Sequence, residues 1–303
     1  MECDAARLYA VTMTTVTDSE RSLREILDVG EDGAPPAPRH LLVTLFGTFG
    51  RTRDNWMSVA AIVRLMETLG VEGSSVRSAI SRLKRKNILV AQRRGGSAGY
   101  SLSDHVLEVI GDGDDRIFVH RRATAADPWL VAVFSVPESE RDKRHLLRTT
   151  LTRLGFGIVA PGVWVVPAVM ADEVRRALRR SGLDEYVDLF AGGHVGFGDL
   201  SQKVSCWWDL DAVSREYRQF IDRYAQLAER VSESAPSDED AFAVYVPMLT
   251  VWRRLPYRDP GIPLANLPSD WPAVAAEQIF AHLYEELHPA AERYVSEVDS
   301  SLT

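Results

Sequence analysis

Apolar residues recur at helical spacing in three successive segments that begin near residue 39. In the first segment, the positions i, i+3, i+4 and i+7 are Leu42, Leu45, Phe46 and Phe49. Ser58 can cap a second helix that continues to residue 69. After a Gly-bounded turn at 70–73, Ser74 or Ser75 can cap a third helix, which continues to residue 86. The pattern therefore predicts three short helices in close succession.

Two short β-rich segments follow the third helix. Residues 88–90 and 100–102 predict strands on either side of the turn-prone stretch 93–99. Three helices followed by a two-stranded ribbon form the element order of a winged helix-turn-helix. We therefore expect a winged helix DNA-binding domain over residues 37–112.

Strand-like and helix-like segments alternate in the middle of the chain. The predicted strands are 129–134, 156–159, 163–166 and 186–190, and the predicted helices contain residues 147–154 and 170–178. The resulting order βαββαβ is the layout of a ferredoxin-like domain. We expect this domain over residues 113–206.

The two ends of the chain have different patterns. Residues 1–36 show little sustained apolar periodicity and lead into proline-rich sequence, so we expect a flexible N-terminal arm, and translation could begin at Met1 or at Met13. Residues 207–303 show helical periodicity, broken by the polar segment 232–240, and predict a helical C-terminal domain for effector binding and dimerisation. The expected fold class is a multidomain α+β protein.

Charge is distributed unevenly along the chain. Residues 39–103 contain eleven Arg and Lys and three acidic residues, a net charge of +8, whereas the whole chain has a formal net charge of -8. One compact basic module is therefore expected beside an acidic remainder, which favours nucleic acid as the partner of the basic part. The sequence shows no membrane-length apolar stretch and no secretory signal, which predicts a cytoplasmic protein without a membrane partner.

The third predicted helix has two different faces. Its apolar side is Val76, Ala79, Ile80 and Leu83, and the opposite side carries Arg and Ser. Arg can read guanine edges in a major groove, and the short Ser side chains allow close approach. The predicted contacts to an operator in double-stranded DNA are Ser74, Ser75, Arg77, Ser78, Ser81, Arg82, Lys84, Arg85, Arg93 and Arg94, the last two at the tip of the ribbon and suited to phosphates. The alternative is a solvated cationic helix without a nucleic-acid role.

Several stretches also resemble the phenylacetic-acid-pathway repressor (PaaX) family. They are residues 39–47, 76–83, 155–157, 161–165, 267–272, 283–284 and 290–294, so the resemblance extends over about residues 38–297. It implies a dimeric DNA-binding repressor, usually of aromatic-acid catabolism, that an aryl-CoA thioester releases from its operator. It also implies a middle domain similar in fold to the small nuclease of CRISPR adaptation.

An acyl-CoA effector requires cations for its phosphates and an apolar, aromatic slot for its acyl group. One C-terminal stretch offers both kinds of residue. The predicted effector-binding residues are Trp252, Arg253, Arg254, Tyr257, Arg258 and Trp271. The alternative is that the aromatic residues belong to the core and that Arg258 pairs locally with Asp259.

Motifs that suggest an enzyme occur in unsuitable contexts. The segment 95–99 fits G-x-S-x-G, but a ribbon strand follows it where a nucleophile elbow needs a helix. The first strand of the ferredoxin-like domain ends in 134–137 without an acidic metal ligand, and the two Cys and seven His residues show no metal-binding spacing. We therefore expect no catalytic residue, metal or cofactor; the alternative is a nucleic-acid-processing enzyme that uses the ferredoxin-like domain.

Overall fold

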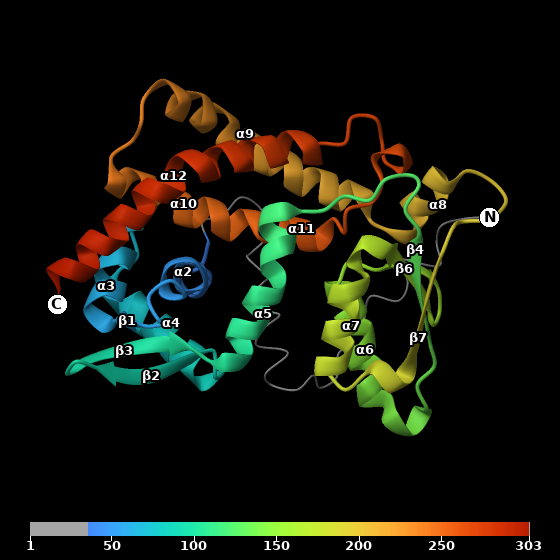
Figure 1. The fold of residues 1–303 in the computed structure, drawn as a ribbon, viewed down its shortest axis with the longest axis horizontal. Helices are drawn as coiled ribbons and strands as arrows, with labels where there is room; N and C mark the ends of the chain where they lie inside the picture. The colour runs from blue at the N-terminus through green and yellow to red at the C-terminus, as the bar shows by residue number, and fades with distance from the viewer. Residues whose placement is uncertain (1–35, 303) are drawn as a thin grey trace. The chain divides into compact units, whose positions relative to one another are not determined.

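The computed structural model describes residues 36–302, which divide into two compact units (Figure 1). The first unit contains residues 115–216 and 255–272. The second contains residues 36–114, 217–254 and 273–302. Within residues 36–302 the chain passes between the two units at four points, so neither unit is contiguous in sequence. The expected flexible arm, residues 1–36, lies outside the described residues except for Pro36.

The second unit begins with three helices and a small sheet. The helices are α2 (Pro38–Leu45), which continues as η3 (Phe46–Gly50), α3 (Val59–Thr68) and α4 (Gly73–Arg85). The strands are β1 (Met57–Ser58), β2 (Leu89–Arg94) and β3 (Ser97–Leu102), in the antiparallel order β1-β3-β2. The three predicted helices are confirmed, and Ser58 caps α3 by accepting a hydrogen bond from the backbone N–H of Ala61.

The expected cap of α4 is wrong. The N-cap is Glu72, whose carbonyl already accepts a hydrogen bond from the backbone N–H of Val76, so the helix begins at Gly73. Neither Ser74 nor Ser75 acts as the cap, since both lie inside the first turn. The positive φ of Gly70 ends the preceding helix early enough for α4 to start there.

The β2–β3 hairpin is longer than the sequence suggests. Each strand has six residues, and the turn between them is only Gly95-Gly96, with φ of 55° and 86°. Two residues with positive φ match the twist of an antiparallel hairpin, and glycine adopts this conformation without strain. Arg93 and Arg94 therefore belong to β2 and not to the turn.

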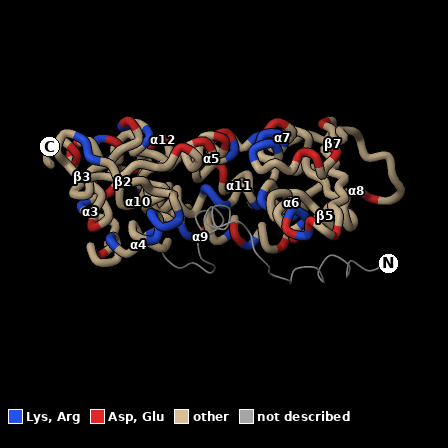
Figure 2. Tube along the Cα trace, turned by 90° about the horizontal axis from the view of Figure 1, so that it is seen from below, with Lys and Arg blue, Asp and Glu red and all other residues tan. Residues whose placement is uncertain are grey.

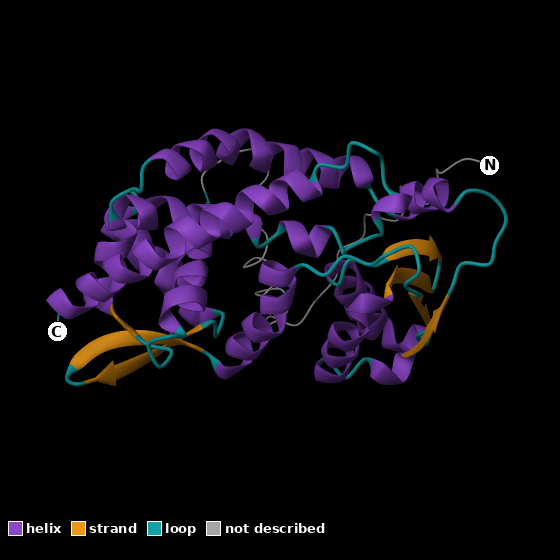
Figure 3. Ribbon diagram, turned by 45° about the horizontal axis from the view of Figure 1, so that its top comes forward, coloured by secondary structure: helices purple, strands orange, loops and turns teal. Residues whose placement is uncertain are grey.

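Later helices complete the second unit. They are α10 (Asp238–Trp252), α12 (Ala273–Ser301) and the part of α9 (Leu210–Glu233) that comprises residues 217–233. Helix α5 (Asp104–Asp114), which follows β3 in the sequence, belongs to the same unit. The Thr250 hydroxyl on α10 donates to the Thr44 hydroxyl on α2 at 2.7 Å, and both side chains are buried. The Thr68 and Tyr294 hydroxyls share a 2.8 Å hydrogen bond between α3 and α12. The N-terminal module, residues 36–103, thus packs against the C-terminal helices (Figure 3).

The first unit is built on a four-stranded sheet. Its elements are β4 (Trp129–Phe134), α6 (Arg141–Arg153), β5 (Gly157–Ala160), β6 (Val163–Pro167), α7 (Ala171–Arg180) and β7 (Val187–Gly192). The strands are antiparallel in the order β5-β6-β4-β7, and α6 and α7 bury Leu147, Leu151 and Val174 against the sheet face that carries Leu130 and Trp164. This topology confirms the expected ferredoxin-like fold.

Short helices complete the first unit at its other segments. These are η4 (Asp115–Val119), α8 (Leu200–Trp207), α11 (Leu255–Arg258) and η8 (Leu264–Asn266). The Trp208 indole N–H donates to the carbonyl of Gly155 at 2.8 Å. Across residues 36–302, no helix combines the length and the apolar character needed to span a membrane.

Candidate nucleic-acid interface

Helix α4 separates its apolar and cationic residues completely. Val76, Ala79, Ile80 and Leu83 are buried, and the polar candidates are all exposed: Ser74, Ser75, Arg77, Ser78, Ser81, Arg82, Lys84 and Arg85. The buried side packs on α2 and α3, which fixes the rotation of the helix about its axis. The exposed side therefore forms a continuous surface, which we call the α4 face.

Part of the charge on the α4 face has a local structural role. Arg82, Lys84 and Arg85 lie in the last turn, where cations offset the partial negative charge of the helix C-terminus. Arg77 is the fifth residue of the helix and lies outside the last turn, so it does not offset the dipole in this way, and its side chain is exposed. The guanidinium of Arg82 donates to the Ser78 hydroxyl at 3.1 Å. Helix stability alone thus gives no reason for Arg77, and an anionic partner does.

The two arginines of β2 lie on opposite faces of the hairpin. Arg93 pairs with Ala98 and is on the same face as Tyr100, over whose ring the Lys84 ammonium lies at 5.8 Å. Arg94 is on the other face, 5.7 Å from the ring centroid of Trp56, and donates to the carbonyl of Asp54 at 3.1 Å. Both are exposed. Arg93 therefore lies on the hairpin face that is turned toward Lys84 of the α4 face. Arg94 lies on the opposite hairpin face, where it contacts Trp56 and Asp54.

Trp56 supports the hairpin, although the sequence analysis did not single it out. A Cβ atom added at Gly99 would lie 2.4 Å from the Trp56 ring and 2.5 Å from the carbonyl of Met57. Only glycine allows β3 to approach this closely. Asn55, with φ of 54°, places its side-chain amide against the backbone of Leu102, donating at 2.8 Å and accepting at 3.1 Å. The turn before β1 thus holds the hairpin at a set position.

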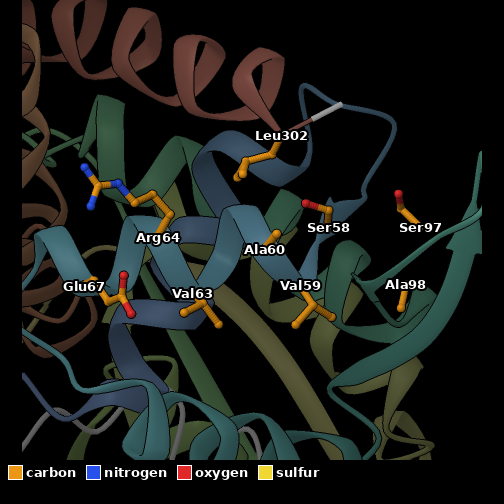
Figure 4. Close-up of a pocket in the computed structure, with 9 residues that line it drawn as sticks. All are labelled: Ser58, Val59, Ala60, Val63, Arg64, Glu67, Ser97, Ala98 and Leu302. Atoms are coloured by element: carbon orange, nitrogen blue, oxygen red, sulfur yellow. The ribbon is translucent and has the colours of Figure 1, made fainter.

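A hollow of about 510 Å³ lies between α3 and β3 (Figure 4). Its lining residues are Ser58, Val59, Ala60, Val63, Arg64, Glu67, Ser97, Ala98 and Leu302. Leu302 reaches it because α12 runs along the N-terminal module, where Glu292 on α12 forms a 2.7 Å ion pair with Arg53. The C-terminal end of the chain is therefore a neighbour of the hairpin, which no local sequence pattern indicates.

The predicted effector residues fall in both units. Trp252, Arg253 and Arg254 belong to the second unit. Trp252 is 1% exposed and stacks on Phe280 at 4.4 Å, and Arg253 is 6% exposed. Trp252 also lies 5.2 Å from the ring of Phe220. In this unit the aromatic candidate is part of a packed cluster.

Tyr257, Arg258 and Trp271 belong to the first unit, and each has a partner there. Arg258 forms a 3.3 Å ion pair with Glu216, not with its neighbour Asp259. The guanidinium of Arg116 lies 4.6 Å from the ring of Tyr257. Trp271 is 9% exposed, and its indole N–H donates to Asp259 at 3.3 Å. The assignment of these six residues to an effector stays a prediction.

Asp259 is the centre of a buried polar cluster in the first unit. Its side chain is 1% exposed and forms a 2.8 Å ion pair with Arg122. Burial alone would raise the pKa of the carboxyl group, but Arg122, His120 and the backbone N–H of Gly261 together lower that pKa below its ordinary value of 3.8. Asp259 is therefore a buried anion, and its ion pair with Arg122 connects residues 255–272 to the segment that precedes β4.

Within the described part of the chain, no group of three or more His, Cys, Asp or Glu is placed to hold a metal ion. Lys and Arg are instead visible along α4 and along α6 and α7 (Figure 2). The chemistry that the N-terminal module offers is that of an exposed cationic surface on a rigid scaffold.

Three family models match consecutive parts of the chain. They are described as PaaX-like protein (residues 37–106), PaaX protein central Cas2-like domain (122–204) and PaaX-like protein C-terminal domain (208–297). Among curated proteins, the chain is 26% identical over 273 residues to Transcriptional repressor PaaX of Escherichia coli (strain K12), covering 88% of this chain and 85% of that repressor. The resemblance inferred from the sequence is confirmed.

A solved structure is similar over most of the chain. It is the uncharacterized protein Rv0674 from Mycobacterium tuberculosis, with a TM-score of 0.53 and 20% sequence identity, covering 86% of this chain and 98% of that protein. At this level of identity the likeness concerns the fold alone.

Proposed function

The chain belongs to the PaaX family, and from that premise we propose that it is a DNA-binding transcriptional repressor whose N-terminal module is a winged helix-turn-helix. In this proposal α4 enters the major groove of an operator, and the β2–β3 hairpin contacts the adjacent phosphates. The regulated genes are those of a catabolic operon related to aromatic acids. An aryl-CoA or similar acyl-CoA thioester releases the repressor from DNA.

The α4 face is the observation that carries the proposal. Eight exposed polar or cationic residues are presented by a helix whose opposite side is fully buried, and one of the cations, Arg77, lies outside the last turn, where cations offset the helix dipole. Similarity to a curated transcriptional repressor favours DNA as the anion that this surface binds.

We propose that the repressor binds as a homodimer. A dimer would present two copies of α4 to half-sites about one helical turn of DNA apart, roughly 34–36 Å, or a multiple of it. The operator is therefore expected to be an imperfect palindrome. Analytical ultracentrifugation of the protein with operator DNA should show two chains on each duplex.

The packing of the second unit offers a route from effector to DNA. Helix α12 carries Phe280, the stacking partner of Trp252, and further along it carries Glu292 and Tyr294, which contact the N-terminal module. A ligand that displaced the aromatic cluster would act on the same helix that supports α3. A ligand changes this equilibrium only if it binds one of the two states more tightly.

Titration of the wild-type protein into DNA from upstream of its own operon tests the DNA-binding part. We expect binding that weakens steeply as salt increases, and that is far tighter than binding to a shuffled duplex of equal length. A wild-type protein that ignores both duplexes at low salt would contradict the proposal.

A panel of CoA thioesters tests the effector part. An aryl-CoA is expected to raise the melting temperature and to reduce operator binding, whereas free CoA is expected to do less because it lacks the acyl group. If no thioester changes either measurement, the acyl-CoA effector is wrong and the DNA-binding proposal is unaffected.

A further inference from the structure

Helix α7, on the first unit, carries four exposed arginines within its last six residues. They are Arg175, Arg176, Arg179 and Arg180, and the apolar side of the same helix, Val174, Ala177 and Leu178, is buried in the core. The neighbouring α6 contains five more Arg and Lys. Together the two helices contain nine basic residues and three acidic ones, in a chain whose formal net charge is -8.

The local structure does not require four arginines at this position. Cations near a helix C-terminus offset the helix dipole, and one or two are sufficient for this effect. Arg175 and Arg179, and likewise Arg176 and Arg180, are like charges at the spacing i, i+4, which destabilises a helix. These repulsions oppose the favourable effect of Arg179 and Arg180 on the helix dipole, so helix stability does not account for four arginines.

The acids within α7 balance little of the charge of Arg175 and Arg179. Glu173 accepts a hydrogen bond at 3.1 Å from Arg116, whose side chain is buried. Asp172 is 3.9 Å from Arg175, in an ion pair whose side chains are 85% and 58% exposed. Such an exposed pair is weak in water, and it does not reach Arg179.

The shape of this surface favours a polyanion over a small ligand. All four arginines project from the exposed side of a helix, whereas small molecules bind in concave sites that bury most of their surface. Double-stranded DNA presents one negative charge for about every 1.7 Å of its axis, so an open cationic surface can meet several phosphates at once.

We propose that the arginines of α7 form a second DNA contact, which binds phosphates without reading sequence. This inference rests on the proposed function, because it supplies the same DNA with a further contact outside the α4 face. It assigns the ferredoxin-like unit a direct part in binding DNA.

Replacing Arg175 and Arg179 by alanine in the full chain tests the proposal. With a random-sequence duplex, the slope of log affinity against log salt should decrease by about 2, roughly one for each lost phosphate contact. Affinity at low salt should fall roughly tenfold or more. The melting temperature should stay close to that of the wild type, because both side chains are exposed and the removed i, i+4 repulsion is balanced by the loss of Arg179 from the last turn.

Arg223→Ala combined with Arg230→Ala is the matched control. Both side chains are exposed on α9, and the double variant loses the same two charges from another part of the chain. The control should keep the wild-type salt slope. An α7 variant with the slope of the wild type or of this control overturns the proposal.

Three further outcomes separate the possible errors. If the wild type binds no duplex, the proposed function itself is wrong; if Arg77→Ala weakens binding but the α7 variant does not, only the second contact is wrong. If the α7 variant keeps its DNA slope but loses a thermal shift produced by free CoA, the arginines bind a small phosphorylated ligand, and the proposal is overturned.

Discussion

The α4 face and the stretch 252–271 are both candidate binding sites, but the molecule holds their side chains in opposite ways. The predicted DNA contacts of α4 are all exposed, and they lie on one helix side of a single unit. The predicted effector residues are divided between two units, and Trp252, Arg253 and Trp271 are buried. Residues that are neighbours in sequence thus form one surface when they lie on a single helix. They lie in different environments when the chain passes from one unit to the other between them.

The difference has a consequence for mutation. Side chains on the α4 face contribute little to the core, so their loss should affect binding and leave stability unchanged. Buried side chains in 252–271 have polar or stacking partners, so their loss should affect stability first. Mutation of exposed and of buried side chains should therefore separate a loss of DNA binding from a loss of stability.

Asp259→Ala is expected to have the largest effect on stability. Removing one partner of a buried ion pair leaves Arg122 without its anion and costs about 3–5 kcal/mol. Chemical denaturation of the variant measures this loss. Asp172→Ala is the control, since that carboxylate is 85% exposed and its removal should cost at most about 1 kcal/mol. Equal losses in the two variants would contradict a buried role for Asp259.

The contribution of Asp259 should also depend on pH. Because the folded protein lowers the pKa of this carboxyl group, its stabilisation is present above the unfolded pKa of about 4 and is lost as pH falls through the folded value. The difference in unfolding free energy between wild type and Asp259→Asn should therefore be constant near neutral pH and shrink below about pH 4. A difference that does not change with pH would show that the charge of Asp259 is not what matters.

Arg77→Ala combined with Arg82→Ala should give the next largest effect, on operator binding alone. Each base-reading arginine contributes about 1–3 kcal/mol, so the double variant should lose roughly 100-fold in affinity or more. Its melting temperature should fall only slightly, because both side chains are exposed and Arg82 contributes only a surface hydrogen bond to Ser78 and a charge in the last turn of α4. A variant that binds normally, or that loses stability in proportion to binding, would place the DNA contact elsewhere.

Part of this account is readable from the sequence, and part is not. The α4 face could be predicted because helical periodicity is local, and the sequence places its cations opposite its apolar residues. The ends of β2 and β3 could not, because residues 91–94, 97 and 98 are exposed in the hairpin and lack a strand-like apolar pattern. Arg122 and Asp259 are 137 positions apart, and only the folded chain brings them together.

Gly99→Ala should have a smaller effect, limited to the N-terminal module. The added methyl group would meet the Trp56 ring and the Met57 carbonyl, which costs about 1–3 kcal/mol of stability and displaces the hairpin. Thermal unfolding and operator binding should both change. Gly111→Ala, in helix α5 with open space around its Cβ, should leave stability unchanged or raise it by up to about 1 kcal/mol. If both variants behave alike, the close approach at Gly99 is unimportant.

The smallest effects should separate the two arginines of β2. Arg93→Ala should reduce the salt slope by about 1, and Arg94→Ala should reduce it less, because Arg94 lies on the hairpin face away from the α4 face and donates to the Asp54 carbonyl. Only Arg94→Ala should also lower stability, by about 0.5–1 kcal/mol, because only Arg94 lies over Trp56. Denaturation curves that coincide for the two variants would contradict the assignment of opposite hairpin faces.

Methylation protection of guanine N7 on the operator tests most directly whether the α4 face reads the major groove. Guanine N7 is exposed only in that groove. We expect the wild-type protein to protect two clusters of guanines about one helical turn, or a multiple of it, apart, and the Arg77→Ala and Arg82→Ala variant to leave them reactive at matched occupancy. Bound wild-type protein that leaves every guanine N7 reactive would contradict the central claim.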